Sequence, residues 1–451
     1  YVPGTSTIRK STLHGLLSLP CTAPAILRTI DGRSPLQLAI NKNVKANVWI
    51  DPKILQQATS YIVHNLGRPA KDRRLVFSTL EAINGHSKFN YTKAIELKTS
   101  AGYPYVKEKS GKGKTHLFSI QDGILVPINL LQQRIESRLA AYQNGVCPPT
   151  IWLDNLKDER RSLEKVNQAN TRTFVCPPVD FTIVSRQYLQ AFVDYVMEKH
   201  LFFDCSVGIN PHSQEWKILY TRLRGVSNEE PYWIAGDFSA FDSSIPAQVG
   251  WAIKDLIQQW YGDTNSLIRD SIFTDVINAV HCAYDALYRV DKGNPSGMPL
   301  TSIFNSFANL ILLRCCWVMI INMLQIPITG SDFDKFVRVA VFGDDNVIAV
   351  HPHCAPFFNM ISISKAMSVL GMQFTDSNKM ISDREFVPFN EITFLKRSFR
   401  KENDLVFAPL EEKSILEMVN WVRNTAPVDE ATRTNCENAV REYFHYGKEI
   451  F

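Results

Sequence analysis

The sequence predicts a mixed α+β or α/β fold built from several subdomains. Strand and helix signals alternate loosely along the 451 residues, a length that allows more than one subdomain and a large core. The composition, 45% apolar and 21% charged, is typical of a soluble globular protein. Strand signals occur at 232–236, 336–342 and 347–350, and helical patterns at 134–142, 247–261, 301–324, 356–370, 411–423 and 429–444.

Charge, cysteine usage and hydropathy restrict the class of protein further. The net charge of +4 does not indicate a polycation, although local basic patches can still bind nucleic acid. Nine cysteines without framework spacing favour reduced thiols in a cytosolic setting. The most membrane-like stretch, 303–326, is interrupted by Asn309 and Arg314, and a charge in mid-helix is costly in lipid. We therefore expect a helix buried in a soluble protein and no transmembrane segment.

Residues 336–350, FVRVAVFGDDNVIAV, have the pattern of a β-hairpin. Two apolar runs rich in β-branched residues flank four turn-type residues at 343–346. The adjacent carboxylates of Asp344 and Asp345 repel each other, and a bound divalent cation would relieve that repulsion. Taken alone, the motif is explained equally well by a solvated turn without chemistry.

The segment YWIAGDFSAFDSS, residues 232–244, supplies two further carboxylates. An apolar strand precedes Asp237, and Asp242 follows five residues later near a helix start. If this strand pairs beside the hairpin, Asp237 and Asp344 could share hard cations, which prefer carboxylate oxygens. A helix cap and a surface turn would explain one of the two aspartates well and both poorly.

A third segment, KGNPSGMPLTSIFNS at 292–306, combines a Gly- and Pro-rich loop with the start of a long apolar helix near Thr301. Ser296, Thr301 and Asn305 offer neutral hydrogen-bonding groups. Such groups suit a sugar hydroxyl, and the 2′-hydroxyl distinguishes RNA from DNA. A well-capped core helix accounts for Thr301, but not for the density of Gly, Pro and Ser before it.

Together with other segments, these motifs resemble those of viral RNA-dependent RNA polymerases of the picornavirus-like superfamily, in the same order and over most of the chain. The additional matching segments are TSTIRKSTLHG at 5–15 (an extended strand from fingers to thumb), TSAGYPY at 99–105 (where template RNA enters), KDERRSLEKVNQANTRTF at 157–174 (a basic fingers motif that contacts triphosphate), GMQFTDSNK at 371–379 (a general-acid lysine) and FLKR at 394–397 (a primer-grip hairpin).

The resemblance implies an α+β fold in the form of a closed right hand, with an antiparallel palm sheet flanked by helices. The implied divisions are fingers 1–188, palm 189–271, a fingers insertion 272–292, palm 293–398 and thumb 399–451. That thumb is short, so it is either compact or lacks its C-terminal part.

The resemblance also implies a role for individual residues. The implied metal ligands are Asp237 and Asp344, assisted by Asp345, with Lys379 as the acid that protonates leaving pyrophosphate. The implied nucleotide-binding residues are Asp242 and Asn305 on the 2′-hydroxyl, Ser296, Gly297 and Thr301 in support, and Lys157, Arg161, Lys165 and Arg172 on the triphosphate. The implied template and primer residues are Thr99, Ser100, Gly102, Tyr103, Pro104, Lys396 and Arg397.

The function implied is template-directed nucleotidyl transfer from NTPs to an RNA or protein-linked primer, by a two-metal mechanism that replicates a positive-strand RNA virus genome. The implied cofactor is Mg²⁺, with Mn²⁺ as an expected substitute. Expected partners are template and primer RNA, NTPs and a small viral protein primer. The expected location is the host cytoplasm, at membrane-associated replication complexes.

Three alternatives remain on the residues alone. A reverse transcriptase shares the chemistry, but enzymes that reject ribonucleotides usually block the space where Asp242 and Asn305 offer partners. A two-metal nuclease or phosphatase would use Asp237, Asp344 and Asp345 without needing the other motifs. A non-enzymatic RNA-binding protein explains basic patches but not carboxylates clustered where phosphate must approach.

Overall fold

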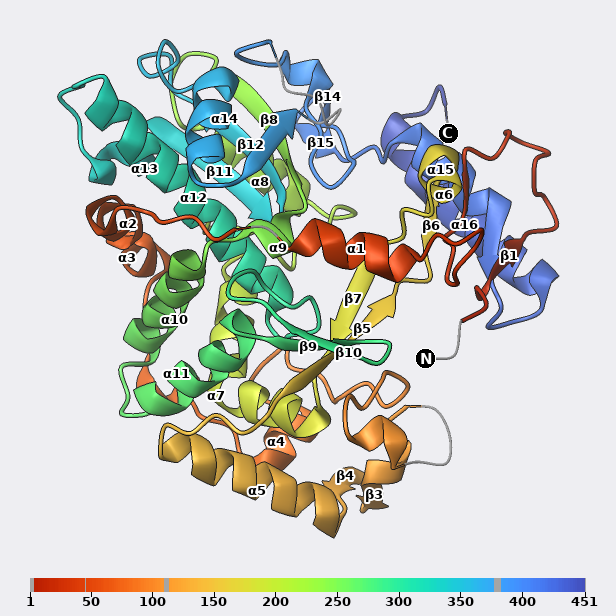
Figure 1. Cartoon of the computed structure of the whole chain (residues 1–451). Coiled ribbons are helices and arrows are strands. Elements are labelled where there is room, and N and C mark those ends of the chain that lie inside the picture. Colours follow the sequence, from red (N-terminus) through yellow and green to blue (C-terminus); the bar gives the residue numbers. More distant parts are fainter. Residues whose placement is uncertain (1–3, 45, 109–112, 377–382, 451) are drawn as a thin grey trace.

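The computed structural model describes residues 4–44, 46–108, 113–376 and 383–450. One of its main elements is a four-stranded antiparallel sheet (Figure 1). The strand order is β11–β12–β8–β13. The strands are β8 (Tyr232–Ser239), β11 (Val337–Phe342), β12 (Asp345–Val350) and β13 (Gln373–Asp376). Strands from three separate parts of the sequence therefore meet in one sheet.

Alternate residues of each strand point to opposite faces of this sheet, and both faces are buried. Ile234, Val339 and Ile348 belong to the main hydrophobic core, into which α12 (Thr301–Met323) and α14 (Met360–Val369) also pack. Trp233 and Ala349 belong to a second cluster, formed with α8 (Glu215–Arg224). Helices thus flank the antiparallel sheet, as the resemblance implied.

A second four-stranded sheet has the order β10–β9–β5–β7. Its strands are β5 (Ile151–Leu156), β7 (Thr173–Cys176), β9 (Val280–Ala283) and β10 (Ala286–Arg289). The β5 and β9 strands run parallel, whereas the other two pairs are antiparallel. Residues 280–289 are therefore joined to the N-terminal part of the chain rather than to the first sheet.

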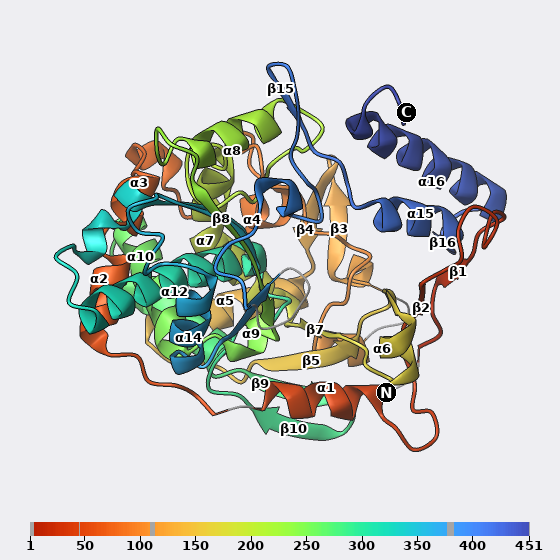
Figure 2. The ribbon, with the colours of Figure 1, turned by 90° about the horizontal axis from the view of Figure 1, so that it is seen from above.

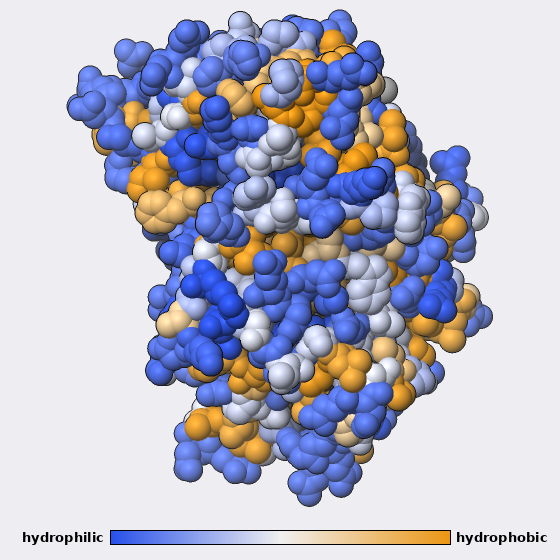
Figure 3. Space-filling model, turned by 90° about the vertical axis from the view of Figure 1, so that its left-hand side faces the viewer, coloured by the Kyte–Doolittle hydropathy of each residue, from blue (hydrophilic) through white to orange (hydrophobic). Residues whose placement is uncertain are grey.

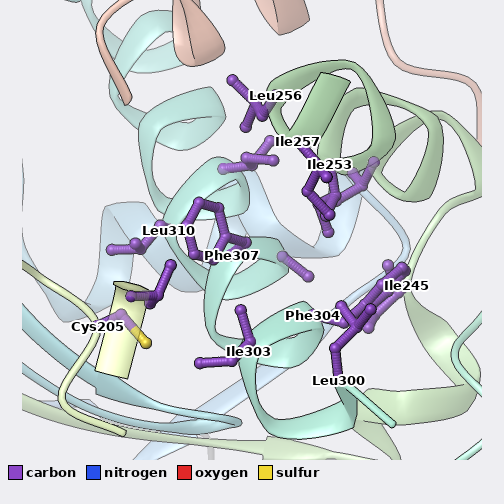
Figure 4. Packing of buried hydrophobic residues seen from close by; sticks show 14 of the residues in the cluster. Cys205, Ile245, Ile253, Leu256, Ile257, Leu300, Ile303, Phe304, Phe307 and Leu310 are labelled. Atoms are coloured by element: carbon purple, nitrogen blue, oxygen red, sulfur yellow. The ribbon is translucent and has the colours of Figure 1, made fainter. Parts of the chain in front are cut away.

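Helix α12 lies at the centre of the protein. Its side chains, including Phe304 and Phe307, pack against Ile253 and Ile257 of α10 (Ala247–Tyr261) (Figure 4). The helix is long and apolar enough to cross a membrane by length and composition, but 94% of its most apolar window is buried inside the protein. Of its polar residues, Arg314 forms an ion pair with Asp334, which satisfies the buried charge.

The first and last described segments of the chain lie on the same side of the molecule (Figure 2). Strand β1 (Ile8–Lys10) pairs antiparallel with β16 (Trp421–Arg423), which lies between α15 (Glu412–Asn420) and α16 (Val428–Tyr443). The backbone contact continues beyond the strand, because Ser11 N donates to Asn420 O at 3.1 Å and Asn424 N donates to Thr7 O at 2.7 Å. The N-terminal arm therefore reaches the C-terminal helices, as the resemblance implied for 5–15.

Most elements predicted from the sequence are present, with differences at their ends. The 247–261 helix is confirmed without change, and the 134–142 helix extends to α5 (Asn129–Gln143). The 356–370 helix begins at Met360 rather than at residue 356, because Asn359 caps it by accepting a hydrogen bond from Ser362 N. The 411–423 helix ends at Asn420, because the next three residues pair with β1 instead.

The remaining elements surround these sheets. The helices are α1 (Pro35–Asn43), α2 (Pro52–Thr59), α3 (Ile62–Leu66), α4 (Thr79–Asn84), α6 (Leu163–Asn167), α7 (Val179–Glu198), α9 (Phe241–Ser244), α11 (Ser266–Ile277) and α13 (Phe333–Phe336), and the two-stranded sheets pair β2 (Thr22–Pro24) with β6 (Arg160–Ser162), β3 (Phe118–Gln121) with β4 (Ile124–Pro127) and β14 (Arg400–Glu402) with β15 (Leu405–Phe407). The face in Figure 3 is largely hydrophilic with apolar groups between, an ordinary protein surface.

Candidate active site

The turn of the β11–β12 hairpin is shorter than the four residues predicted. Phe342 pairs with Asp345, so only Gly343 and Asp344 lie in the turn, and Asp345 begins the second strand. Gly343 has φ +64°, a left-handed conformation that suits glycine. The turn rests on α12, where the Ser306 hydroxyl accepts from Gly343 N at 2.8 Å.

The register of the sheet brings the predicted metal ligands to neighbouring positions, on β8 and at the β11–β12 turn. Asn346 pairs with Gly236, so the next position places Asp345 opposite Asp237, with Asp344 exposed in the adjoining turn. Asp237 lies within β8 rather than at its end, which corrects the sequence prediction. The neighbouring position, 236, requires glycine for this packing of the sheet, because a Cβ there would lie 2.1 Å from the Phe374 ring.

Beside these carboxylates, Asp242 is linked to two asparagines. Asn305 donates its side-chain amide to Asp242 Oδ1, and Asn294 donates to Asn305 Oδ1 at 2.9 Å. The backbone N–H of Asn294 also donates to Asp242 O at 2.8 Å. The 2′-hydroxyl pair predicted from the sequence is therefore brought into direct contact, and Asn294 fixes the orientation of the Asn305 amide.

The electrostatics of Asp242 connect it to the hairpin and to a basic cluster. Burial raises its pKa to about 6, and the charge of Asp344 adds to the rise. The hydrogen bond from Asn305 and the charges of Arg172 and Lys157 act in the opposite direction. Acidic and basic groups from three separate segments thus act on one another across a single site.

The loop before α12 supports this site without presenting its hydroxyls to it. Ser296 Oγ accepts from Val175 N at 3.3 Å, and Thr301 Oγ1 donates to Met298 O at 2.7 Å. At Gly297 a Cβ would lie 1.8 Å from Val175 O, so only glycine allows the loop to approach β7 this closely. Ser296, Gly297 and Thr301 thus fix the shape of the loop, and their support of a bound nucleotide remains a prediction.

The basic motif is organised by Glu159, a residue that sequence reasoning did not assign. Arg172 forms a two-pronged contact with its carboxylate, with Nε 2.6 Å from Oε1. Lys157 Nζ lies 3.5 Å from Oε2, and Arg161 Nη1 lies 3.7 Å from Oε1. Burial opposes ionisation, but these cations hold the pKa of Glu159 below its usual range. The fourth predicted cation, Lys165, lies on α6, immediately after β6.

Glu159 and Asn294 were missed for different reasons. Glu159 stands in a segment with charges of both signs. The only signal in the sequence was its position as an acidic residue between several cations, which could have indicated that they share it as a partner. Asn294 lies in the quoted loop, but its role depends on a contact with a residue one helical turn inside α12. Asn309 was noted only as an interruption, yet its amide donates to Gly343 O at 3.1 Å and to Asp344 O at 3.2 Å.

The 99–105 segment forms a tight loop against the start of α7. Val179 N donates to Ala101 O at 3.0 Å, and a Cβ at Gly102 would lie 2.1 Å from Pro177 O. Thr99 Oγ1 accepts from the largely buried Lys114 ammonium, and Ser100 Oγ accepts from Gly102 N. Tyr103 and Pro104 follow in the same loop, joined by a cis peptide bond. The loop is rigidly held, and its contact with RNA remains a prediction.

The two basic residues of the 394–397 hairpin face opposite environments. Lys396 is exposed at the turn, 3.9 Å from Glu411. Arg397 is buried, and its two terminal nitrogens donate to Glu442 at 2.7 and 2.8 Å. The expectation that Arg397 holds the primer backbone is therefore wrong, because its guanidinium points into the protein and joins the hairpin to α16. Lys379, the predicted general acid, lies outside the described residues.

The donor set fits a hard divalent cation. Asp237, Asp344 and Asp345 supply carboxylate oxygens, the ligands that Mg²⁺ prefers. Burial is the main cause of the raised pKa of Asp242, and the negative charge of Asp344 adds to it, so the two carboxylates lie near enough to repel each other. A bound cation would offset that charge.

The arrangement is that of a nucleic-acid polymerase of the right-hand class: an antiparallel sheet carries carboxylates beside its hairpin turn, and Asn305 and a basic cluster lie near them. The family profile described as "Viral RNA-dependent RNA polymerase" matches residues 44–451, and the chain belongs to that family. The membership confirms the family and the class of enzyme, RNA-directed RNA polymerase, inferred from the motifs.

Individual relatives agree with this assignment. The chain is 32% identical to the replicase polyprotein of acute bee paralysis virus and 30% identical to the genome polyprotein of rice tungro spherical virus. These matches cover 100% and 99% of the chain but only 24% and 14% of the polyproteins. A solved sicinivirus 3Dpol RNA-dependent RNA polymerase matches with a TM-score of 0.79 at 22% identity, covering 99% of this chain and 93% of that one. The predicted right-hand fold is thereby confirmed.

Proposed function

We propose that the chain adds nucleotides from NTPs to the 3′ end of an RNA or protein-linked primer, directed by an RNA template. The observation that carries this proposal is the position of the Asp242–Asn305 pair beside the hairpin turn, where Asn305 Cβ lies 4.0 Å from the place that a Cβ on Gly343 would take. Asp242, which contacts Asn305, is acted on by Asp344 from the hairpin and by Arg172 and Lys157 from the basic motif. Groups suited to a metal, a ribose and a triphosphate thus share one site.

In this proposal Asp237 and Asp344 hold two divalent ions, Mg²⁺ or Mn²⁺, and Asp345 assists. Bound ions of this kind supply Lewis-acid stabilisation of the attacking and leaving oxygens in phosphoryl transfer. The support is the donor set and the register that places Asp345 opposite Asp237.

The other residues bind and orient the nucleotide. Arg172, Arg161 and Lys157 neutralise the triphosphate, and their shared ion pairs with Glu159 hold the three cations in one cluster. Lys165 is proposed to add a fourth positive charge. Asp242 and Asn305 hydrogen-bond to the 2′-hydroxyl, which a deoxynucleotide lacks. Lys379 is proposed to protonate the leaving pyrophosphate, so Lys379→Leu should lower the single-turnover rate without weakening RNA binding, and an unchanged rate would remove it from this role.

The proposed domains are fingers 1–188 and 272–292, palm 189–271 and 293–398, and thumb 399–451. This division is supported by the pairing of β9 with β5, which attaches the insertion to the N-terminal part. Template RNA is proposed to follow the 99–105 loop, and Lys396 to contact the primer. Replication of a positive-strand RNA genome with a protein primer, in the host cytoplasm at membrane-associated complexes, completes the proposal.

The test is extension of a primed RNA template in Mg²⁺ or Mn²⁺ by wild type, Asp344→Asn and a matched control, Asp122→Asn, in the exposed β3–β4 turn. Asp344→Asn should abolish extension with unchanged circular dichroism, while the control keeps wild-type activity. Extension by Asp344→Asn at the wild-type rate would overturn the metal assignment. Degradation of the primer without extension would favour a nuclease, and equal use of DNA and RNA templates would favour a reverse transcriptase.

A further inference from the structure

Alternate side chains of residues 157–161, which run from just after β5 into β6, serve two different parts of the molecule. Lys157, Glu159 and Arg161 belong to the basic cluster around Arg172. Asp158, between them, instead faces the N-terminal arm and the C-terminal helices. One short segment therefore lies between the proposed triphosphate site and the contact of the N-terminal arm with the C-terminal helices.

The carboxylate of Asp158 is fully engaged by the N-terminal arm. Ser6 Oγ donates to Oδ1 at 2.7 Å, and both the backbone N–H and the hydroxyl of Thr7 donate to Oδ2 at 2.7 Å. Arg423 Nη1 lies 3.8 Å from Oδ2, and its Nη2 donates to Asp158 O at 3.0 Å. Burial opposes ionisation, but these donors hold the pKa of Asp158 below its usual range, so it is charged at neutral pH.

The same contact anchors the pairing of the two ends of the chain. Ser6 and Thr7 immediately precede β1, and Arg423 is the last residue of β16, paired with Ile8. Arg423 Nη1 also donates to Thr7 Oγ1 at 3.2 Å. Asp158 therefore sits where β1, β16 and the basic segment meet.

A second contact from the same segment reaches the C-terminal helices. Arg160 donates to the backbone carbonyl of Glu417 in α15. The Glu417 carboxylate in turn accepts from Cys21 N at 2.7 Å and from the Thr22 hydroxyl in β2, which pairs with β6. The segment is thus held from one side by Asp158 and Arg160, while Glu159 and Arg161 project towards the site.

We propose that Asp158 is a positioning residue that couples the closed contact between the N-terminal arm and the C-terminal helices to nucleotide affinity. It acts through its neighbours, because a shift of Asp158 moves Glu159 and with it the cations that Glu159 arranges. This inference rests on the proposed binding of triphosphate by Lys157, Arg161 and Arg172. Coupling of this kind is reciprocal, so bound nucleotide should also stabilise the β1–β16 pairing.

The test uses Asp158→Asn, which keeps the side-chain shape but turns one acceptor into a donor facing donors. The KM for NTP should rise about tenfold, since hydrogen bonds to a charged group are lost, while kcat changes much less. Amide exchange over residues 8–10 and 421–423 should quicken. In wild type, saturating NTP should slow that exchange, and in Asp158→Asn it should not.

Three further variants make the outcome decisive. Thr7→Val removes one donor and retains the backbone N–H, so it should give a smaller effect of the same kind if Asp158→Asn fails to fold. Asp122→Asn is the matched control and should leave both KM and exchange unchanged. In an Arg172→Ala background the effect of Asp158→Asn on KM should shrink, because the group it positions is gone.

Two results would overturn the inference. Faster exchange at β1 with an unchanged KM in Asp158→Asn would show that Asp158 only anchors the arm. A KM effect of Asp158→Asn that persists undiminished with Arg172→Ala would show that it does not act through the basic cluster. An Arg172→Ala variant with wild-type KM would instead contradict the proposed triphosphate role itself, which separates the two failures.

Discussion

Arg397→Met is the sharpest test of how the hairpin at 394–397 is held in the structure. The Arg397 guanidinium is buried and donates twice to Glu442 of α16 and once to Ala408 O. Methionine fills similar volume but leaves the Glu442 carboxylate without its main partner. We expect the C-terminal helices to loosen and RNA affinity to change little by direct contact.

The magnitude follows from burial. Side chains of Arg397 and Glu442 are only 10% and 11% exposed, so solvent screens the pair weakly. Removing one partner of a buried pair costs about 3–5 kcal/mol, and we take about 3 kcal/mol because His212 lies 3.5 Å from Glu442. Local opening of α16 should then be on the order of a hundredfold more frequent.

The assay is amide exchange over residues 428–443, together with thermal unfolding. At about 2.1 cal/mol/K per residue over 451 residues, 3 kcal/mol lowers a global midpoint by roughly 3 °C. The pKa of Glu442 lies below its usual range although burial opposes ionisation, because Arg397 stabilises the carboxylate. This stabilisation is present above the unfolded-state pKa of glutamate and is lost as pH falls through the lowered folded value, so the two proteins should converge in acid.

The matched control is Lys396→Met at the neighbouring, exposed position. It should cost less than about 1 kcal/mol of stability, as expected for a surface charge, but weaken binding of primed RNA. If Arg397→Met kept wild-type exchange and midpoint while RNA affinity fell, the structural role argued for Arg397 would be refuted.

The other predictions concern the Asp242–Asn305 pair and the loop beside it. Asn305→Ala should relax discrimination against deoxynucleotides, measured as the ratio of kcat/KM for the two sugars; an unchanged ratio would count against its role. The folded-state pKa of Asp242 is raised to about 6, above its unfolded value near 4, so ionising this carboxyl lowers the stability of the folded protein as pH rises between these two values. Asp242→Asn should therefore stabilise the metal-free protein at pH 7 by about 1–3 kcal/mol. The same variant should lower selectivity for ribonucleotides. Chemical denaturation at pH 4 and pH 7 tests this, since the gain should vanish at the lower pH. Gly297→Ala should lower the free energy of unfolding by about 1–3 kcal/mol or more, and with it the unfolding midpoint, because the added Cβ would meet Val175 O. A wild-type denaturation curve would show that the loop has room to move.

Much of the local structure could be predicted because it depends on residues close in sequence. Apolar runs predicted β8, β11 and β12, and helical spacing predicted α10 with its observed ends. Helix ends were less predictable where a distant strand competed for the backbone, as at residues 421–423, or where a cap lay a few residues inside the expected start, as at Asn359.

The sequence by itself determined which chemical groups this polymerase offers: paired aspartates after an apolar strand, an asparagine one turn into a long helix, and a run of basic residues. Only the tertiary structure decided which of them face one another. The sequence suggested that Arg397 contacts RNA, but its guanidinium is buried and pairs with Glu442, 45 residues away. Asp158 stands among many charges in the sequence, and its partner in the structure is Ser6, 152 residues away. The physical reason is that a charged side chain takes the partner that long-range strand pairing and helix packing bring to it, and that partner cannot be read from neighbouring residues.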